Sequence, residues 1–228
     1  MSIDYLRFLR MVIRSDDIVE RADVIAIVKT VYEHAFKALG TEFIRAHRAI
    51  ENIEKAYKKE RGEGLVILEK IDQPYIEART AMGIFIKDLA LPKTLKTLTT
   101  ATDKRDAIAR MLEILDAHDD EPGWAKDITD GAFGRLALEA IREISEWIKA
   151  DGDLEKAIRE RAAAFAAAYP AFLDFRSQVR ASYGTSSVHH RRLIVRANGK
   201  LAVDDPADTD TDADTDVVNP TDAGPTEG

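Results

Sequence analysis

The chain has 228 residues, no cysteine and a formal net charge of −8. Without cysteine it forms no disulfide, no thiolate metal site and no cysteine nucleophile, which fits a reducing compartment. Residues 204–228 hold nine carboxylates and no basic side chain, so residues 1–203 carry a net charge of +1. The acidic balance therefore belongs to the end of the chain, and the near-neutral remainder argues against a dedicated nucleic-acid coat.

The first part of the chain has the apolar spacing of amphipathic helices. Asp17 and Glu20 have the spacing of a capping box, and Gly40 suits the position after a helix C-terminus. Thr41 suits the start of another helix. We therefore predict helices over residues 5–14, 17–39 and 41–62.

The middle of the chain is divided by glycine and proline. Gly62-Glu63-Gly64 predicts a short connection, after which the next helix returns antiparallel. That helix is expected to run to Leu91, to bend at Pro74 and to be stopped by Pro92. Further helices are predicted over residues 103–115, 131–150 and 153–184, with a loop at 119–123, a turn at 151–152 and a kink or break at Pro170.

The apolar period changes after Gly184. Two runs rich in apolar residues, Arg192–Ala197 and Lys200–Val203, flank Asn198-Gly199, which is the strongest short-range signal for a β-hairpin. The final segment is built from Asp, Thr, Pro and Gly and cannot form a core. We predict an all-α protein: an antiparallel multi-helix bundle at 1–184, a basic hairpin at 185–203 and a disordered acidic tail at 204–228.

The sequence offers weak support for metal or catalytic chemistry. His47, Glu51 and Glu54 share one face of a predicted helix, and Glu69 and Asp72 on the returning helix would complete a possible metal site. Charged residues at this spacing more often form a solvated surface. The chain has no His-Glu-x-x-His, Walker A, Gly-x-Gly-x-x-Gly or Gly-x-Ser-x-Gly motif. An enzyme is therefore not the favoured interpretation, and no cofactor is predicted.

A basic block is the best candidate for binding. No acidic residue occurs from Phe175 to Val203. The block can lie along phosphates, contact a protein partner or be covered by the acidic tail. Tyr183 is its one neighbouring aromatic residue, which weakens the case for base stacking. The predicted partner-binding residues are Arg176, Arg180, His189, His190, Arg191, Arg192, Arg196 and Lys200.

Three functional hypotheses follow. The favoured one is a non-enzymatic interaction or assembly protein, a scaffold or adaptor, that self-associates or docks a protein partner through its C-terminal hairpin and tail. The second is a nucleic-acid-binding module inhibited by its own acidic tail. The third is a ligand- or metal-binding helical bundle. No secretory signal or apolar run of about 20 residues is visible, so we expect a cytoplasmic protein without membrane contact.

Overall fold

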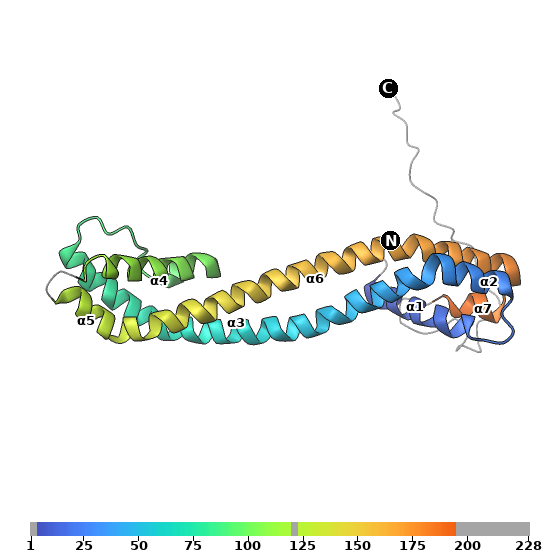
Figure 1. The fold of residues 1–228 in the computed structure, drawn as a ribbon, viewed down its shortest axis with the longest axis horizontal. Coiled ribbons are helices and arrows are strands. Elements are labelled where there is room, and N and C mark those ends of the chain that lie inside the picture. The colour runs from blue at the N-terminus through green and yellow to red at the C-terminus, as the bar shows by residue number, and fades with distance from the viewer. Residues whose placement is uncertain (1–3, 120–122, 195–228) are drawn as a thin grey trace, which may run out of the picture. The chain divides into compact units, whose positions relative to one another are not determined.

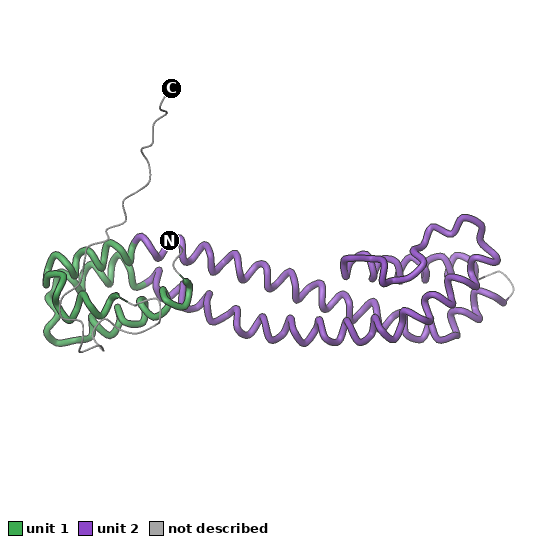
Figure 2. The backbone as a smooth tube through the Cα atoms, turned by 180° about the vertical axis from the view of Figure 1, so that it is seen from behind, with its two compact units in different colours: residues 1–37, 171–228 green, residues 38–170 purple. Residues whose placement is uncertain are grey.

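The computed structural model describes residues 4–119 and 123–194, and every regular element in these ranges is helical (Figure 1). The predicted all-α class is confirmed for the described part of the chain. Two compact units are formed (Figure 2). Unit 1 takes residues 1–37 and 171–228, and unit 2 takes residues 38–170. The predicted domain boundaries at residues 184 and 203 remain predictions.

Unit 1 is built from short helices of the N-terminal part and from the last part of the chain's longest helix. Asp4 caps its first helix by accepting a hydrogen bond from the backbone N–H of Leu6 at 3.1 Å. The elements are α1 (Tyr5–Val19), α2 (Ala26–Val31), the π-helix η1 (Tyr32–Phe36), the end of α6 (Ala132–Tyr183) and α7 (Val188–Arg192).

The core of unit 1 is aromatic. Phe36 stacks on Phe175 with ring centroids 5.9 Å apart, and Tyr32 meets Phe175 edge-on at 5.5 Å. Phe172 contacts Phe36 at 5.7 Å and Phe8 at 5.8 Å. Edge-on and offset contacts of this kind add stability beyond the apolar area that they bury. The cluster therefore fixes α1, η1 and the end of α6 to one another within unit 1.

Unit 2 consists of two long antiparallel helices with shorter helices at one end (Figure 2). Phe43 of α3 contacts Phe165 of α6, Gly64 lies against Trp147, and Tyr75 meets Phe133. Rising numbers on α3 pair with falling numbers on α6, as antiparallel helices require. The elements are α3 (Lys37–Phe85), the 3₁₀ helix η2 (Leu95–Thr97), α4 (Ala101–Asp116), α5 (Trp124–Asp130) and α6.

The core of unit 2 is mostly aliphatic. Ile71, Met82, Ile108, Met111 and Ile144 are fully buried in one cluster that joins α3, α4 and α6. On α6 the small residues Ala137 and Ala140 let the neighbouring helices approach closely. No helix in the described ranges is both long enough and apolar enough to cross a lipid bilayer.

Several predicted helix ends are wrong. Gly40, Gly62, Gly64 and Gly152 lie inside α3 or α6. A Cβ atom added to Gly64 would stand 3.0 Å from Cε3 of Trp147, so this glycine admits the indole ring instead of ending a helix. Packing between the two long helices therefore outweighs the local glycine signals, and no antiparallel return occurs at residues 62–64.

The predicted break after the first helix is also misplaced. α1 continues through Asp17 to Val19, and the chain turns before α2 begins at Ala26. Pro74 and Pro170 lie within α3 and α6, and α3 ends at Phe85 instead of Leu91. The helix α5 was not predicted, and α4 begins at Ala101 with Thr100 as its cap.

The described start of the predicted hairpin is helical. Ser187 accepts a hydrogen bond from the backbone N–H of His190 at 3.1 Å and so caps α7. Arg192 ends that helix, and Leu193 follows in a helical conformation with its side chain fully buried. The predicted strand therefore does not begin at Arg192. Residues 195–203 of the predicted hairpin and residues 204–228 of the predicted tail lie outside the described residues.

Candidate partner-binding site

The described part of the basic block gathers at the end of α6 and on α7, within unit 1. Arg176 and Arg180 lie four residues apart, and therefore on one face of α6. Arg191 and Arg192 lie in the last turn of α7. Arg180 is exposed and the other three arginines are half-buried. The remaining predicted members, Arg196 and Lys200, lie outside the described residues.

A tight connection brings the two helices together. Gly184 follows α6 with φ of 82°, a left-handed conformation that glycine adopts at little cost. Its N–H donates to the carbonyl of Arg180 at 2.8 Å, and its own carbonyl accepts from the Ser187 hydroxyl at 2.9 Å. Four residues, 184–187, thus suffice to end α6 and to start α7. The prediction that Gly184 ends a helix is confirmed.

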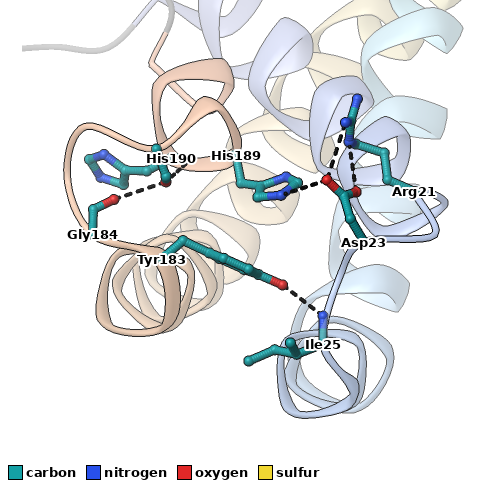
Figure 3. A network of polar contacts seen from close by, with 8 residues as sticks. Arg21, Asp23, Ile25, Tyr183, Gly184, His189 and His190 are labelled. Atoms are coloured by element: carbon teal, nitrogen blue, oxygen red, sulfur yellow. Dashed lines mark hydrogen bonds and ion pairs between the residues drawn. The ribbon is translucent and has the colours of Figure 1, made fainter.

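His189 anchors α7 to the segment between α1 and α2 (Figure 3). Its Nε2 lies 3.3 Å from Oδ2 of Asp23, and its ring centroid lies 4.5 Å from that of Tyr183. The Tyr183 hydroxyl oxygen in turn accepts from the backbone N–H of Ile25 at 2.7 Å. A hydrogen bond from Arg21 lowers the pKa of Asp23, which keeps that carboxylate ionised beside the histidine.

His190 points to the other side of α7 (Figure 3). Its Nδ1 lies 3.1 Å from the carbonyl of Thr185, so this nitrogen carries the hydrogen and donates it. Its Nε2 is buried and has no hydrogen-bond partner. Burial lowers the pKa of His190 below the ordinary value of 6.5, and the nearby charges of Arg176 and Arg180 lower it further. His190 is therefore held neutral next to two guanidinium groups.

The Asp23–His189 pair has the elements of a general base with its orienting carboxylate. However, the second ring nitrogen of His189, Nδ1, is buried and has no hydrogen-bond partner. A substrate would have to reach that atom to use it. The contacts with Asp23 and Tyr183 instead hold α7 in place, and the arginines around it supply positive charge.

The charge of unit 1 supports a binding role. Its described residues include ten arginines and lysines but seven carboxylates. In the described residues of unit 2, 21 basic side chains face 23 carboxylates. From Phe175 to Ile194 no carboxylate is present, and Arg176, Arg180 and Arg192 make no ion pair with a described residue. This end of unit 1 therefore attracts anionic groups.

The predicted metal ligands do not converge. His47 is buried and its ring packs on Phe43 at 5.8 Å, whereas Glu51 and Glu54 are exposed. Asp72 is also buried, but it accepts hydrogen bonds from the hydroxyl of Thr94 and the backbone N–H of Leu95. Asp72 therefore fixes the loop that contains η2.

A different carboxylate group assembles in unit 2. Glu60 on α3 and Glu143 and Glu146 on α6 have carboxylate oxygens within 4.8 Å of one another. They are therefore close enough to hold a divalent cation together. Lys59 bonds Glu60 at 2.9 Å and Arg142 bonds Glu143 at 2.6 Å, so part of this negative charge is already balanced. Single-sequence spacing did not find the group because its members come from two helices.

A groove of about 670 Å³ lies beside these carboxylates, between α3 and α6. Val66 and Ile67 form part of its wall, and charged side chains form most of the remainder. Apolar side chains are also exposed on this helix pair: Leu65 by 47%, Val66 by 52% and Leu138 by 72%. The sequence pattern did not identify this surface, since these residues also suit a helix core.

Comparison with known proteins finds no matching family model, no similar curated protein and no similar solved structure.

Proposed function

We propose that this protein is a non-enzymatic interaction or assembly protein. The helix pair of unit 2 would associate with a second copy, and the C-terminal segment would dock a protein partner. The observation that carries the proposal is the low burial of that pair. From Glu51 to Glu63 no residue of α3 is buried, and from Asp151 to Ala167 Ala157 alone is buried on α6.

Low burial matters because a helix pair needs a further layer to enclose a core. Two helices that leave Leu65, Val66 and Leu138 exposed can complete a four-helix arrangement with another pair. Self-association would remove these side chains from water, at about 25 cal/mol for each Å² of apolar surface. A second copy is the simplest partner because each copy presents the same exposed apolar side chains of α3 and α6 to the other.

The basic block supports a protein partner better than a nucleic acid. The aromatic side chains of this block are already engaged: Phe175 is fully buried, and the Tyr183 ring packs on His189 while its hydroxyl bonds Ile25. They are therefore not free to stack on a base. Arginine clusters without aromatic platforms suit acidic protein segments, which they bind through ion pairs and bidentate hydrogen bonds.

Light scattering of the full chain after size-exclusion separation tests self-association. We expect a dimer or a larger oligomer, and Leu65→Glu combined with Leu138→Glu is expected to shift it to a monomer. The control is Ile84→Glu, which introduces one such charge at a side chain of α3 that is 78% exposed. A full chain that stays monomeric at high concentration would contradict the assembly proposal.

A further inference from the structure

We infer that the acidic segment at residues 204–228 docks within the same chain on the arginines at the end of α6 and on α7. The docking surface consists of Arg176, Arg180, Arg191 and Arg192. The segment would cover the surface that the proposed function assigns to a protein partner, and would compete with that partner. The biological meaning of the inference rests on the proposed function, whereas its test measures the intramolecular contact itself.

Charge complementarity is the first support. The docking surface carries four guanidinium groups, and no carboxylate occurs between Phe175 and Ile194. The segment carries eight aspartates and Glu227, and no basic residue. Isolated exposed ion pairs contribute little to stability, but a polyanion facing several fixed cations forms many weak contacts at once.

The negative ends of the helix dipoles offset only part of this positive charge. Arg180 lies in the last turn of α6, and Arg191 and Arg192 lie in the last turn of α7. Each helix C-terminus is equivalent to about half a negative charge, so two ends offset about one positive charge of the four. The surface therefore keeps a clear positive excess for another anion.

The described carboxylates do not pair with Arg176, Arg180 or Arg192. Asp23, the carboxylate that contacts α7, already bonds Arg21 and His189. His190 lies close enough to Arg176 and Arg180 for their charges to lower its pKa, so this neighbour of the arginines is neutral and adds no negative charge. Arg176, Arg180 and Arg192 have no ion-pair partner among the described residues.

The last described residue, Ile194, lies two residues after Arg192 of the docking surface. Ile194 follows α7 directly, and Asp204 comes ten residues later. Ten extended residues span at most about 35 Å, whereas the one turn from Arg176 to Arg180 covers about 6 Å. The first aspartates can therefore reach the whole surface. Two sites joined by only about ten residues have an effective local concentration on the order of millimolar, which favours binding in cis.

A spin label tests the inference on the full chain. Because the sequence has no cysteine, Ala213→Cys provides one labelling site in the middle of the acidic segment. The measurement is the paramagnetic relaxation of backbone amides by NMR. At about 0.01 M salt, where charges act over about 30 Å, we expect the strongest relaxation at residues 176–192. At about 1 M salt it should fall about fivefold or more, because charges then act over about 3 Å.

Two charge variants sharpen the result. Arg176→Gln with Arg180→Gln is expected to reduce the relaxation at residues 176–192 by about half or more, in line with the loss of two of four cations. The matched control is Arg48→Gln with Arg135→Gln, which removes two exposed arginines of unit 2 and should leave the relaxation unchanged. A control variant with the same loss as the test variant would overturn the inference.

Dilution separates this inference from self-association. Docking in cis predicts relaxation that stays the same after tenfold dilution. Relaxation that disappears on dilution would show that the segment binds a second copy, and would overturn docking in cis while leaving assembly intact. Relaxation spread evenly over both units, or unaffected by salt, would also overturn it. Light scattering on the same samples reports the oligomeric state independently.

Discussion

Unit 1 and unit 2 use different side chains to hold helices together. In unit 1, five aromatic rings from α1, η1 and the end of α6 contact one another, and the surface around α7 is basic. In unit 2, aliphatic side chains form the core at one end, while a long stretch of the α3–α6 pair buries very little. An aromatic cluster therefore fixes the helices of unit 1 to one another, whereas part of the helix pair of unit 2 stays exposed.

The largest expected effect is the loss of an aromatic ring in unit 1. Phe36 is 1% exposed and contacts Tyr32, Phe172 and Phe175. Phe36→Ala should lower the free energy of unfolding by about 3–5 kcal/mol, because it removes buried area and leaves a cavity. Urea denaturation followed by circular dichroism measures the loss, and hydrogen exchange at the end of α6 assigns it to unit 1.

A matched control lies on α6, next to Phe172 in the sequence. Leu173→Ala removes a neighbouring side chain that is 39% exposed, so it should cost well under half as much. If the two substitutions destabilised the protein equally, the aromatic cluster would not be the feature that holds unit 1 together.

The second prediction concerns close helix contact in unit 2. A Cβ atom added to Gly134 would stand 1.8 Å from the carbonyl oxygen of Thr129, whereas one added to Gly152 meets nothing within 4 Å. Gly134→Ala should therefore destabilise the protein by about 3 kcal/mol, since backbone must move. Gly152→Ala, on the same helix, should stabilise it by about 1 kcal/mol.

The fluorescence of Trp124 and Trp147 measures both glycine variants, because both indoles belong to unit 2. A stabilising effect of Gly134→Ala would mean that α6 starts differently from the packing described above. A destabilising effect of Gly152→Ala would show that the exposed part of the helix pair has a neighbour that restricts it.

The smallest expected effect is a pH dependence confined to unit 1. The pKa of His190 is lowered from 6.5 by burial and by Arg176 and Arg180, so the unfolded chain binds the proton more readily than the folded one. The contribution of His190 is therefore fully present above about pH 6.5 and is lost as the pH falls through the folded-state pKa.

Proton NMR of the histidine Cε1–H resonances follows this titration directly, and urea midpoints at several pH values follow its effect on stability. His190→Gln should flatten the decline between neutral and mildly acidic pH, because glutamine has no ionisable group. Titration of His190 at or above its ordinary pKa would contradict its burial beside the two arginines.

Several local features of unit 1 were accessible from the sequence. Gly184 ends α6 as its position after an apolar run predicts, and the absence of carboxylates from Phe175 to Ile194 is visible in the sequence. What the pattern missed is the Ser187 cap, which turns the expected start of a strand into α7. The contact between His189 and Asp23 was not accessible, because 166 positions separate the two residues and no short motif links them.

The sequence by itself determined the helical class, the separation of charge and the end of α6, because periodicity, composition and a positive-φ glycine are local properties. Only the tertiary structure decided where the long helices continue. Gly64 carries a terminator signal, but Trp147 packs against it and the helix goes on. The tertiary structure also brings Glu60, Glu143 and Glu146 together, because α3 and α6 run antiparallel. Contacts between distant residues outweigh local propensity because they remove side chains from water. A local sequence pattern does not contain these contacts.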